Sequence, residues 1–192
     1  METLERKIAR AIKEFVAVVP YDPRWPQMFR EEKKHLLSCL PRPPVRRIEH
    51  FGSTAIPGLV AKPIVDMVVE VTSLDDTRRK IPAILGAQGY DYFWRPMWTD
   101  DAPPFYAWFI KRDSYGNRTH HIHMVEPHFE LWDGLLFRDY LIEHPQAARE
   151  YGELKMNLSH LHRGDRIAYT KAKSEFVLRV TDLAKEYYAK NR

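Results

Sequence analysis

Apolar residues repeat with the period of a helix in some segments of the chain and with the period of a strand in others. Each change of period marks the boundary of an expected element. Residues 3–14 repeat apolar side chains at helical spacing, and a second helix is expected from Pro26 to Pro41. The runs VRRIEHFG and IVDMVVEV instead read as strands, and FVAVVPYDP before them reads as a short strand. The two longer strands are separated by the loop STAIPGLVAKP, which is rich in small residues.

The middle of the chain continues this mixture. SLDDTRRKIPAILGAQGY is expected to form a helix that Ser73 caps, and DYFWRPMWTDDAPPF is expected to form a long aromatic loop. This aromatic tract could cover a site as a lid or stack on a base, or simply pack into the core. YAWFIKRD and RTHHIHMVE flank Ser-Tyr-Gly-Asn, which predicts a hairpin.

From Trp132 onward the pattern becomes helical. Three segments, DGLLFRDYLIEH, PQAAREYGELKMNLSHLH and DRIAYTKAKSEFVLRVTDLAKEYYAKN, predict three helices. The element order predicts an α+β fold with a helical C-terminal part at about 132–192. Because no linker interrupts the sequence, we expect 1–192 to form a single domain.

The composition is that of an ordinary globular protein. Of the 192 residues, 44% are hydrophobic and 29% are charged, and no apolar run is long enough to span a bilayer. The charged N-terminal segment does not resemble a signal peptide, and the single cysteine, Cys39, excludes an internal disulfide, so we expect a cytoplasmic protein. The net charge of +4 permits a phosphate-bearing ligand and does not demand nucleic acid or a membrane; the oligomeric state stays open.

A carboxylate interrupts the apolar strand IVDMVVEV. By the period of two, Asp66 shares a strand face with Ile64, Val68 and Glu70, while the other face is uniformly apolar. Burying an unpaired carboxylate costs several kcal/mol. We therefore expect Asp66 to face a ligand site and to meet a cation there, which could be a metal ion, Lys62, an arginine or a histidine.

The loop before this strand suits an anion. Gly52 lets the backbone turn tightly and approach a ligand, and Ser53 and Thr54 offer hydroxyl and backbone N–H groups. Lys62 lies just before the strand, where it could bind phosphate or pair with Asp66; a solvated lysine is the alternative.

Histidines gather on a later strand. In RTHHIHMVE, His121 and His123 share one face and His120 takes the other. We interpret His121 and His123 as metal ligands or as an acid–base pair beside Asp66, with hydrogen bonding in the core as the alternative. Arg118 could bind phosphate or lie in solvent, and Lys173, at helical spacing from Tyr169 and Phe176, could bind phosphate or extend to water.

These motifs resemble a known family. A Gly-Ser pair that ends a strand, followed a dozen residues later by Asp in an apolar strand, is similar to the nucleotidyltransferase superfamily signature. The longer stretch IEHFGSTAIPGLVAKPIVDMVV resembles the GrpB family, as do RTHHIHMVE, FRDYLIEHPQAAREYGELK and AYTKAKSEFV. The resemblance covers about 16–182.

The resemblance implies a nucleotidyltransferase-like fold, a mixed β-sheet flanked by helices. In active members of that superfamily the Gly-Ser loop holds a nucleotide triphosphate, and carboxylates two residues apart, with a third from a later strand, hold two Mg²⁺ ions. Gly52 and Ser53 match the loop and Asp66 matches the first carboxylate, but Val68 stands at the second position and His121 and His123 stand near the third. Glu70 could substitute for the second carboxylate. The histidines suit Zn²⁺, Mn²⁺ or Ni²⁺ better than Mg²⁺.

Three functions are therefore compatible with the sequence. The first is metal-dependent transfer of a nucleotidyl or phosphoryl group, with Asp66 and either Glu70 or the histidines as catalytic residues. The second is a binding module for a nucleotide or phosphorylated metabolite that has lost catalysis, as Val68 suggests. The third is a metal-dependent hydrolase or metal-binding protein built on Asp66, His121 and His123. Nucleic-acid binding has weaker support, because no recognition motif is present.

Overall fold

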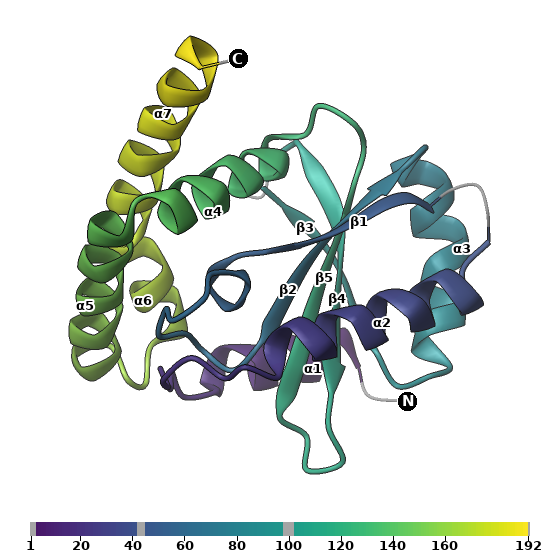
Figure 1. Cartoon of the computed structure of the whole chain (residues 1–192). Helices are drawn as coiled ribbons and strands as arrows, with labels where there is room; N and C mark the ends of the chain where they lie inside the picture. Colours follow the sequence, from purple (N-terminus) through teal and green to yellow (C-terminus); the bar gives the residue numbers. More distant parts are fainter. Residues whose placement is uncertain (1–2, 42–44, 98–101, 192) are drawn as a thin grey trace. The chain divides into compact units, whose positions relative to one another are not determined.

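The computed structural model of the chain describes residues 3–41, 45–97 and 102–191 (Figure 1). These residues group into two compact units. The sheet unit comprises Pro23–Ala55 and Ile64–Trp132, and the helical unit comprises Met1–Asp22, Ile56–Pro63 and Asp133–Arg192. The helical unit is thus assembled from three separate stretches of sequence.

The sheet unit is built on a mixed five-stranded sheet. In chain order its elements are α2 (Trp25–Cys39), β1 (Val45–Phe51), the 3₁₀ turn η1 (Ser53–Ala55), β2 (Val65–Val71), α3 (Leu74–Gly86), β3 (Asp91–Pro96), β4 (Phe105–Arg112), β5 (Arg118–Val125) and the 3₁₀ turn η2 (Glu130–Trp132). The strand order is β1-β2-β5-β4-β3, and β2 pairs with β5 in parallel while the other neighbours are antiparallel. The predicted α+β class with a mixed sheet and helices is confirmed.

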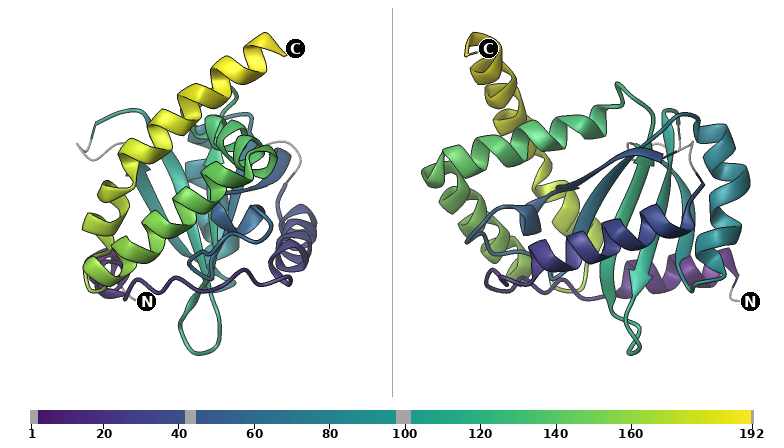
Figure 2. Two further views of the ribbon diagram at one scale, coloured as in Figure 1. Left: turned by 60° about the vertical axis from the view of Figure 1, so that its left-hand side comes forward. Right: turned by 45° about the vertical axis from the view of Figure 1, so that its right-hand side comes forward.

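One face of this sheet forms the core of the unit. The core face carries alternate residues of the two central strands, all fully buried: Val65, Met67, Val69, Ile122 and Met124. Helices α2 and α3 pack on it, since Phe29 of α2 stacks on His50 at 4.9 Å between ring centroids and Arg78 of α3 lies over the Trp94 ring (Figure 2). The opposite face, here named the Asp66 face, carries Asp66, Val68, Glu70, His121 and His123.

The helical unit has a core of its own. Its elements are α1 (Leu4–Lys13), α4 (Asp133–Glu143), α5 (Pro145–Leu161), α6 (Arg166–Ala172) and α7 (Ser174–Lys190). Six buried residues form the centre of its core: Ile56, Leu59, Phe137, Leu141, Tyr151 and Val180. Pro145 occupies the first turn of α5, where a missing N–H costs no hydrogen bond, and it separates α4 from α5 as predicted.

Two of the predicted helices and strands differ from the structure. The segment FVAVVPYDP contributes only an isolated bridge between Val19 and Ala61, because Pro20 and Pro23 have no N–H to donate to a ladder. The last predicted helix is divided into α6 and α7 at Lys173. Since Lys173 keeps helical dihedral angles (φ −87°, ψ −16°), the apolar period continues across the break and does not reveal it.

The predicted aromatic loop is also partly wrong, because its first residues form the edge strand β3. Cross-strand aromatic pairs hold this strand, among them Phe93 and Trp108 with ring centroids 5.3 Å apart. Pro96 stands at the end of β3, the position where an edge strand tolerates proline. Residues 98–101 of the predicted loop lie outside the described residues.

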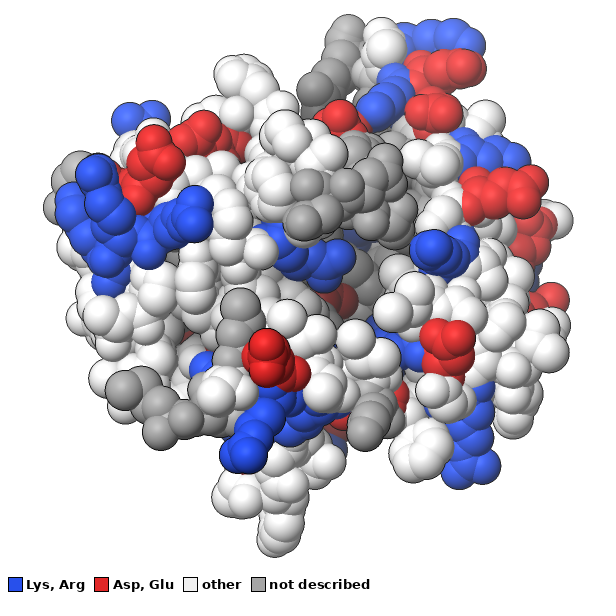
Figure 3. Space-filling model, turned by 180° about the vertical axis from the view of Figure 1, so that it is seen from behind, with Lys and Arg blue, Asp and Glu red and all other residues white. Residues whose placement is uncertain are grey.

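The distribution of surface charge and the character of the helices agree with two features of the sequence, its small net charge and its lack of a long apolar run. Figure 3 shows basic and acidic side chains interspersed over one face of the molecule. Within the part of the chain that the structure describes, no helix has both the length and the apolar character required to cross a bilayer.

Candidate functional site

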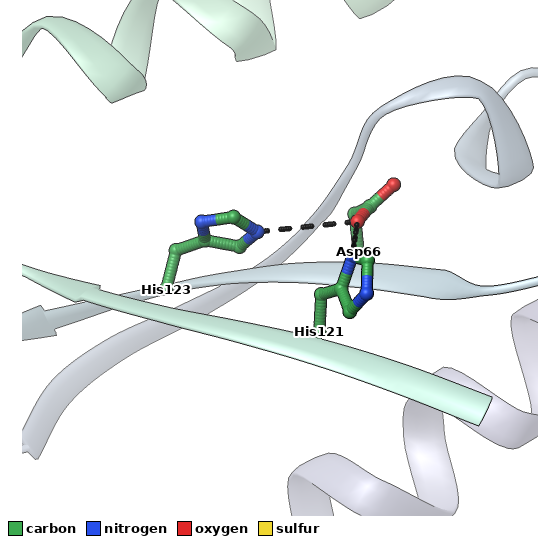
Figure 4. Close-up of side chains that lie close together, drawn as sticks. All are labelled: Asp66, His121 and His123. Atoms are coloured by element: carbon green, nitrogen blue, oxygen red, sulfur yellow. Dashed lines mark hydrogen bonds and ion pairs between the residues drawn. The ribbon is translucent and has the colours of Figure 1, made fainter. Parts of the chain in front are cut away.

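The parallel pairing of β2 with β5 brings three predicted site residues together. In this register Asp66 lies opposite His121, and Val68 lies opposite His123. Residues opposite each other in neighbouring strands project from the same face, so all three polar side chains lie on the Asp66 face (Figure 4). A pairing between segments 55 residues apart in sequence thereby creates the cluster.

The donor atoms of these three side chains converge. Asp66 Oδ1 lies 3.0 Å from His121 Nδ1 and 3.9 Å from His123 Nε2. One donor atom from each residue lies within 4.8 Å of the others. The side chains are 30%, 11% and 12% exposed, respectively, so the cluster is largely shielded from water while its carboxylate stays accessible.

This spacing fits a divalent transition-metal ion. Zn²⁺ binds nitrogen and carboxylate oxygen at about 2.0–2.2 Å, which places neighbouring donors of a tetrahedral site about 3.4 Å apart. The two histidine–carboxylate separations of 3.0 and 3.9 Å bracket that value, and the three donor atoms lie within 4.8 Å of one another. Two imidazoles and one carboxylate also suit Zn²⁺, Mn²⁺ or Ni²⁺ better than Mg²⁺, which prefers oxygen donors. A set of three protein ligands leaves at least one coordination position for water or substrate.

Arg118 determines the tautomer of His121. Its Nη1 lies 3.2 Å from His121 Nε2, and a guanidinium can only donate, so Nε2 accepts this hydrogen bond. In the neutral ring the proton is then on Nδ1, which donates to Asp66 Oδ1 at 3.0 Å. A metal ion at Nδ1 therefore requires this proton to leave, and Arg118 opposes its transfer to Nε2.

His123 directs Nε2 toward Asp66. Its other nitrogen, Nδ1, lies 3.3 Å from the hydroxyl of the buried Tyr106, and the edge of the ring packs against Phe51. A partner on the second nitrogen fixes the orientation of a ligating histidine. Burial raises the pKa of Tyr106 to about 12, so its hydroxyl keeps its proton at neutral pH.

The site holds neutral histidines beside an ionised carboxylate. Burial lowers the pKa of His121 to about 3, although Asp66 favours the protonated ring, and burial also lowers the pKa of His123. Burial raises the pKa of Asp66, but the hydrogen bond from His121 and the nearby His123 ring outweigh it, so the net shift is downward. Neutral imidazole and carboxylate are the forms that bind a metal ion.

Gly52 lets the loop backbone pass close to Asp66. Its φ is +71°, and a Cβ at this position would lie 2.8 Å from Asp66 Oδ2. Thr54 is buried, and its hydroxyl lies 3.0 Å from His50 Nε2, so this predicted ligand anchors the loop. The Ser53 hydroxyl, by contrast, has no hydrogen-bond partner among the described residues and remains available to a ligand.

Glu70 does not join the converging group. It lies on the same face of β2, but four residues of strand place its backbone about 13 Å from that of Asp66. The structure therefore brings together Asp66, His121, His123 and Arg118, with Gly52 against them, and leaves Glu70 apart.

Lys62 and Lys173 belong to the helical unit, where they flank Tyr169. Their Nζ atoms lie 5.4 and 4.7 Å from the centroid of the Tyr169 ring. The buried Lys155 donates to the Val60 carbonyl, and burial together with the charge of Lys173 lowers the pKa of Lys155 to about 6. The sequence pattern predicted no role for Lys155, and the assignment of Lys62 and Lys173 to phosphate stays a prediction.

Two other residues on the Asp66 face were missed as site residues. The Trp108 ring lies 5.0 Å from His121 and 6.0 Å from His123 between centroids, and Arg95 lies over Trp108. Because Arg95 was assigned to a loop, its strand face was not considered. The aromatic residues 92–94 were the signal that this segment is a strand. As a strand it pairs with residues 105–110, and Arg95 then lies on the same sheet face as His123.

The family model described as GrpB protein matches residues 15–183. The chain belongs to the GrpB family. The GrpB resemblance inferred from the motifs is therefore confirmed, and it covers nearly the same range.

Relatives of the GrpB family agree with this assignment. A UPF0157 protein of Pseudomonas aeruginosa is 38% identical over 167 residues, which cover 86% of this chain and 66% of that protein. The glutamate-rich protein GrpB of Alkalihalophilus pseudofirmus is 36% identical over 163 residues, covering 84% of this chain and 91% of its own length. The crystal structure of the conserved protein GrpB from Enterococcus faecalis matches with a TM-score of 0.77 and 30% identity, covering 90% of this chain and 99% of that one.

Proposed function

We propose that this GrpB family protein is a metal-dependent enzyme that transfers a nucleotidyl or phosphoryl group. The observation that carries the proposal is the convergence of Asp66, His121 and His123 on one face of the sheet. The proposal includes a nucleotidyltransferase-like fold for the sheet unit. It is supported by the sequence order, in which β1 is followed by Gly52 and Ser53 and then by Asp66 on the adjacent strand β2.

Each residue has a distinct role in the proposed site. Asp66, His121 and His123 would hold one divalent ion, which would act as a Lewis acid toward a phosphoryl oxygen and would activate a bound hydroxyl group. Ser53 donates a hydrogen bond from its hydroxyl to the phosphate, and Gly52 lets the loop that carries Ser53 pass close to Asp66. Arg118 adds positive charge beside His121 and balances the charge of the phosphate.

Hydrolysis of a phosphate ester is the second candidate, with water as the acceptor. Val68 favours it, because nucleotidyl transfer by two Mg²⁺ ions uses a carboxylate at that position, and Glu70 lies too far along β2 to share an ion with Asp66. A single ion that activates water needs no second carboxylate.

Binding to the metal-stripped protein tests the proposal. Calorimetry with Mg²⁺, Mn²⁺ and Zn²⁺ is followed by thermal shifts with nucleoside triphosphates, CoA-type nucleotides and inorganic phosphate. We expect Mn²⁺ or Zn²⁺ to bind one per chain, and a nucleotide at 100 times its Kd to add about 2.7 kcal/mol of stability when the ion is present. Asp66→Asn should lose both effects, whereas the matched variant Glu70→Gln on the same strand face should keep them.

The reaction class is then decided by products. With the stabilising nucleotide and ion, release of pyrophosphate on addition of an acceptor indicates nucleotidyl transfer, and steady release of inorganic phosphate in water alone indicates hydrolysis. Nucleotide binding without any ion, unchanged in Asp66→Asn, would instead indicate a binding module and overturn the proposal.

A further inference from the structure

Arg95 and Trp108 lie on the Asp66 face directly beside the three converging side chains. Trp108 pairs in register with His123, and Arg95 pairs with Tyr106 on the same sheet. The guanidinium carbon of Arg95 lies 4.8 Å from the Trp108 ring centroid and 5.6 Å from that of Tyr106. Both side chains are therefore within a short reach of any group bound at His123.

Within the residues that the structure describes, these two side chains have hydrogen-bond donors without an acceptor. Trp108 Nε1 is buried and has no hydrogen-bond partner among the described residues. A buried N–H that is left unsatisfied is destabilising. Arg95 is half-buried, and in the described ranges it contacts aromatic rings but neither a carboxylate nor any other acceptor. A ligand that accepts hydrogen bonds would satisfy both groups.

The charges at this position favour an anion. Arg118 lies beside His121 at 3.2 Å, and burial, with a smaller contribution from the charge of Arg95, lowers the pKa of His123. Arg118 also lies over the Trp108 ring, with its guanidinium carbon 5.8 Å from the centroid. Trp108 therefore lies near two guanidinium groups, that of Arg118 beside His121 and that of Arg95 toward His123. Asp66 is the one carboxylate in the converging group.

We propose that Arg95 and Trp108 form an oxyanion subsite that binds a terminal phosphate group of the substrate next to the three ligands. This inference deepens the proposed function and rests on it for the placement of the ion. The indole N–H and the planar guanidinium donate to phosphate oxygens, and Arg95 is held in place by the rings of Trp108 and Tyr106. A phosphate suits this arrangement better than a carboxylate, because it has enough oxygens to bind the ion, the indole and the guanidinium together.

Two measurements on the same variants separate this subsite from the metal site. Mn²⁺ affinity is measured by calorimetry in wild-type protein, Arg95→Gln and Trp108→Phe, and inorganic phosphate and pyrophosphate are then titrated with Mn²⁺ saturating. We expect Mn²⁺ affinity to change less than threefold in both variants. Phosphate affinity should fall at least tenfold in Arg95→Gln and threefold to tenfold in Trp108→Phe, which keeps a ring but removes the N–H. Arg95→Lys should restore part of the loss.

An exposed arginine away from the Asp66 face serves as the control for both affinity measurements. Arg79→Gln removes an arginine whose side chain is 72% exposed on α3 and should leave both affinities unchanged. Phosphate affinity that is unchanged in Arg95→Gln and Trp108→Phe, or acetate binding as tight as phosphate binding, would overturn the subsite. If Mn²⁺ fails to bind while phosphate still requires Arg95, the subsite stands and the metal-dependent function fails.

Discussion

The two faces of the central sheet use the same strands for different purposes. On the core face, Met67 and Ile122 are completely buried under α2 and α3. One residue along each strand, Asp66 and His121 form a hydrogen-bonded pair of polar groups on the other face. The alternation of the β-strand therefore separates the buried core from the candidate site by a single residue step.

His120 makes this difference explicit. It is buried on the core face, where its Nε2 lies 3.4 Å from the Met28 carbonyl and its Nδ1 lies 3.0 Å from the Thr119 hydroxyl. Its hydrogen-bonding groups are satisfied by α2 and by its own strand, whereas His121 and His123 converge on Asp66. Neighbouring histidines of one strand thus divide into a structural residue and candidate ligands.

The largest expected effect comes from removing a ligand. His123→Ala should lower the affinity for Zn²⁺ or Mn²⁺ by about 100-fold or more, since it removes one of the three proposed ligands. His120→Ala, on the opposite face, should change that affinity less than threefold. Calorimetry on metal-stripped protein measures both. Equal losses in the two variants would show that the faces are not functionally separate.

The next effect in size concerns stability. Ile122→Ala lies between the two histidines but on the core face, and it should lower the free energy of unfolding by about 2–5 kcal/mol. Metal affinity of the folded protein should stay within threefold of wild type, because the residue points away from the ions' ligands. Urea denaturation followed by circular dichroism gives the first quantity. A loss below about 0.5 kcal/mol would contradict the assignment of this face to the core.

A loop glycine should show a smaller combined effect. Gly52→Ala places a Cβ 2.8 Å from Asp66 Oδ2 and strains a backbone with φ of +71°, so we expect a stability loss of about 1–3 kcal/mol and weaker metal binding. Gly116→Ala is the matched control: its φ is +85°, but a Cβ there meets nothing within 4 Å. Denaturation should detect strain in both, and only Gly52→Ala should lose metal affinity.

The smallest effect is expected at Arg118. Because its guanidinium holds the proton of His121 on the ligating Nδ1, Arg118→Met should favour the other tautomer and tighten Zn²⁺ binding by about threefold. The same variant should weaken phosphate binding, since a positive charge is lost. Titrations of each ligand on one preparation distinguish the two effects. Weaker Zn²⁺ binding in Arg118→Met would show that Arg118 supports His121 as a ligand instead of opposing it.

Much of this arrangement could be predicted from strand periodicity. The face shared by Asp66 and Glu70, and the division of His121 and His123 from His120, both follow from a period of two. Periodicity does not give the order of strands in a sheet. The proximity of Asp66 to His121 was therefore predicted from the family resemblance, and the pairing of β2 with β5 in the structure establishes it.

The remainder depended on tertiary contacts. Arg95 was hidden in a predicted loop because Pro96 and the residues after it resemble a loop sequence, while the pairing that makes this segment a strand is with β4. The tautomer of His121 depends on the position of Arg118, three residues earlier, which strand spacing alone would direct to the other face.

The parallel contact between β2 and β5 also has a consequence for the order of folding. β4 and β5 are neighbours in sequence and can close as a hairpin early, which places His121 and His123 before Asp66 arrives. Asp66 joins them only when a chain segment 55 residues away docks, a step with a larger cost in chain entropy. The contacts of an ion bound to all three residues would then form only after the transition state for folding. Such an ion would slow unfolding more than it speeds folding.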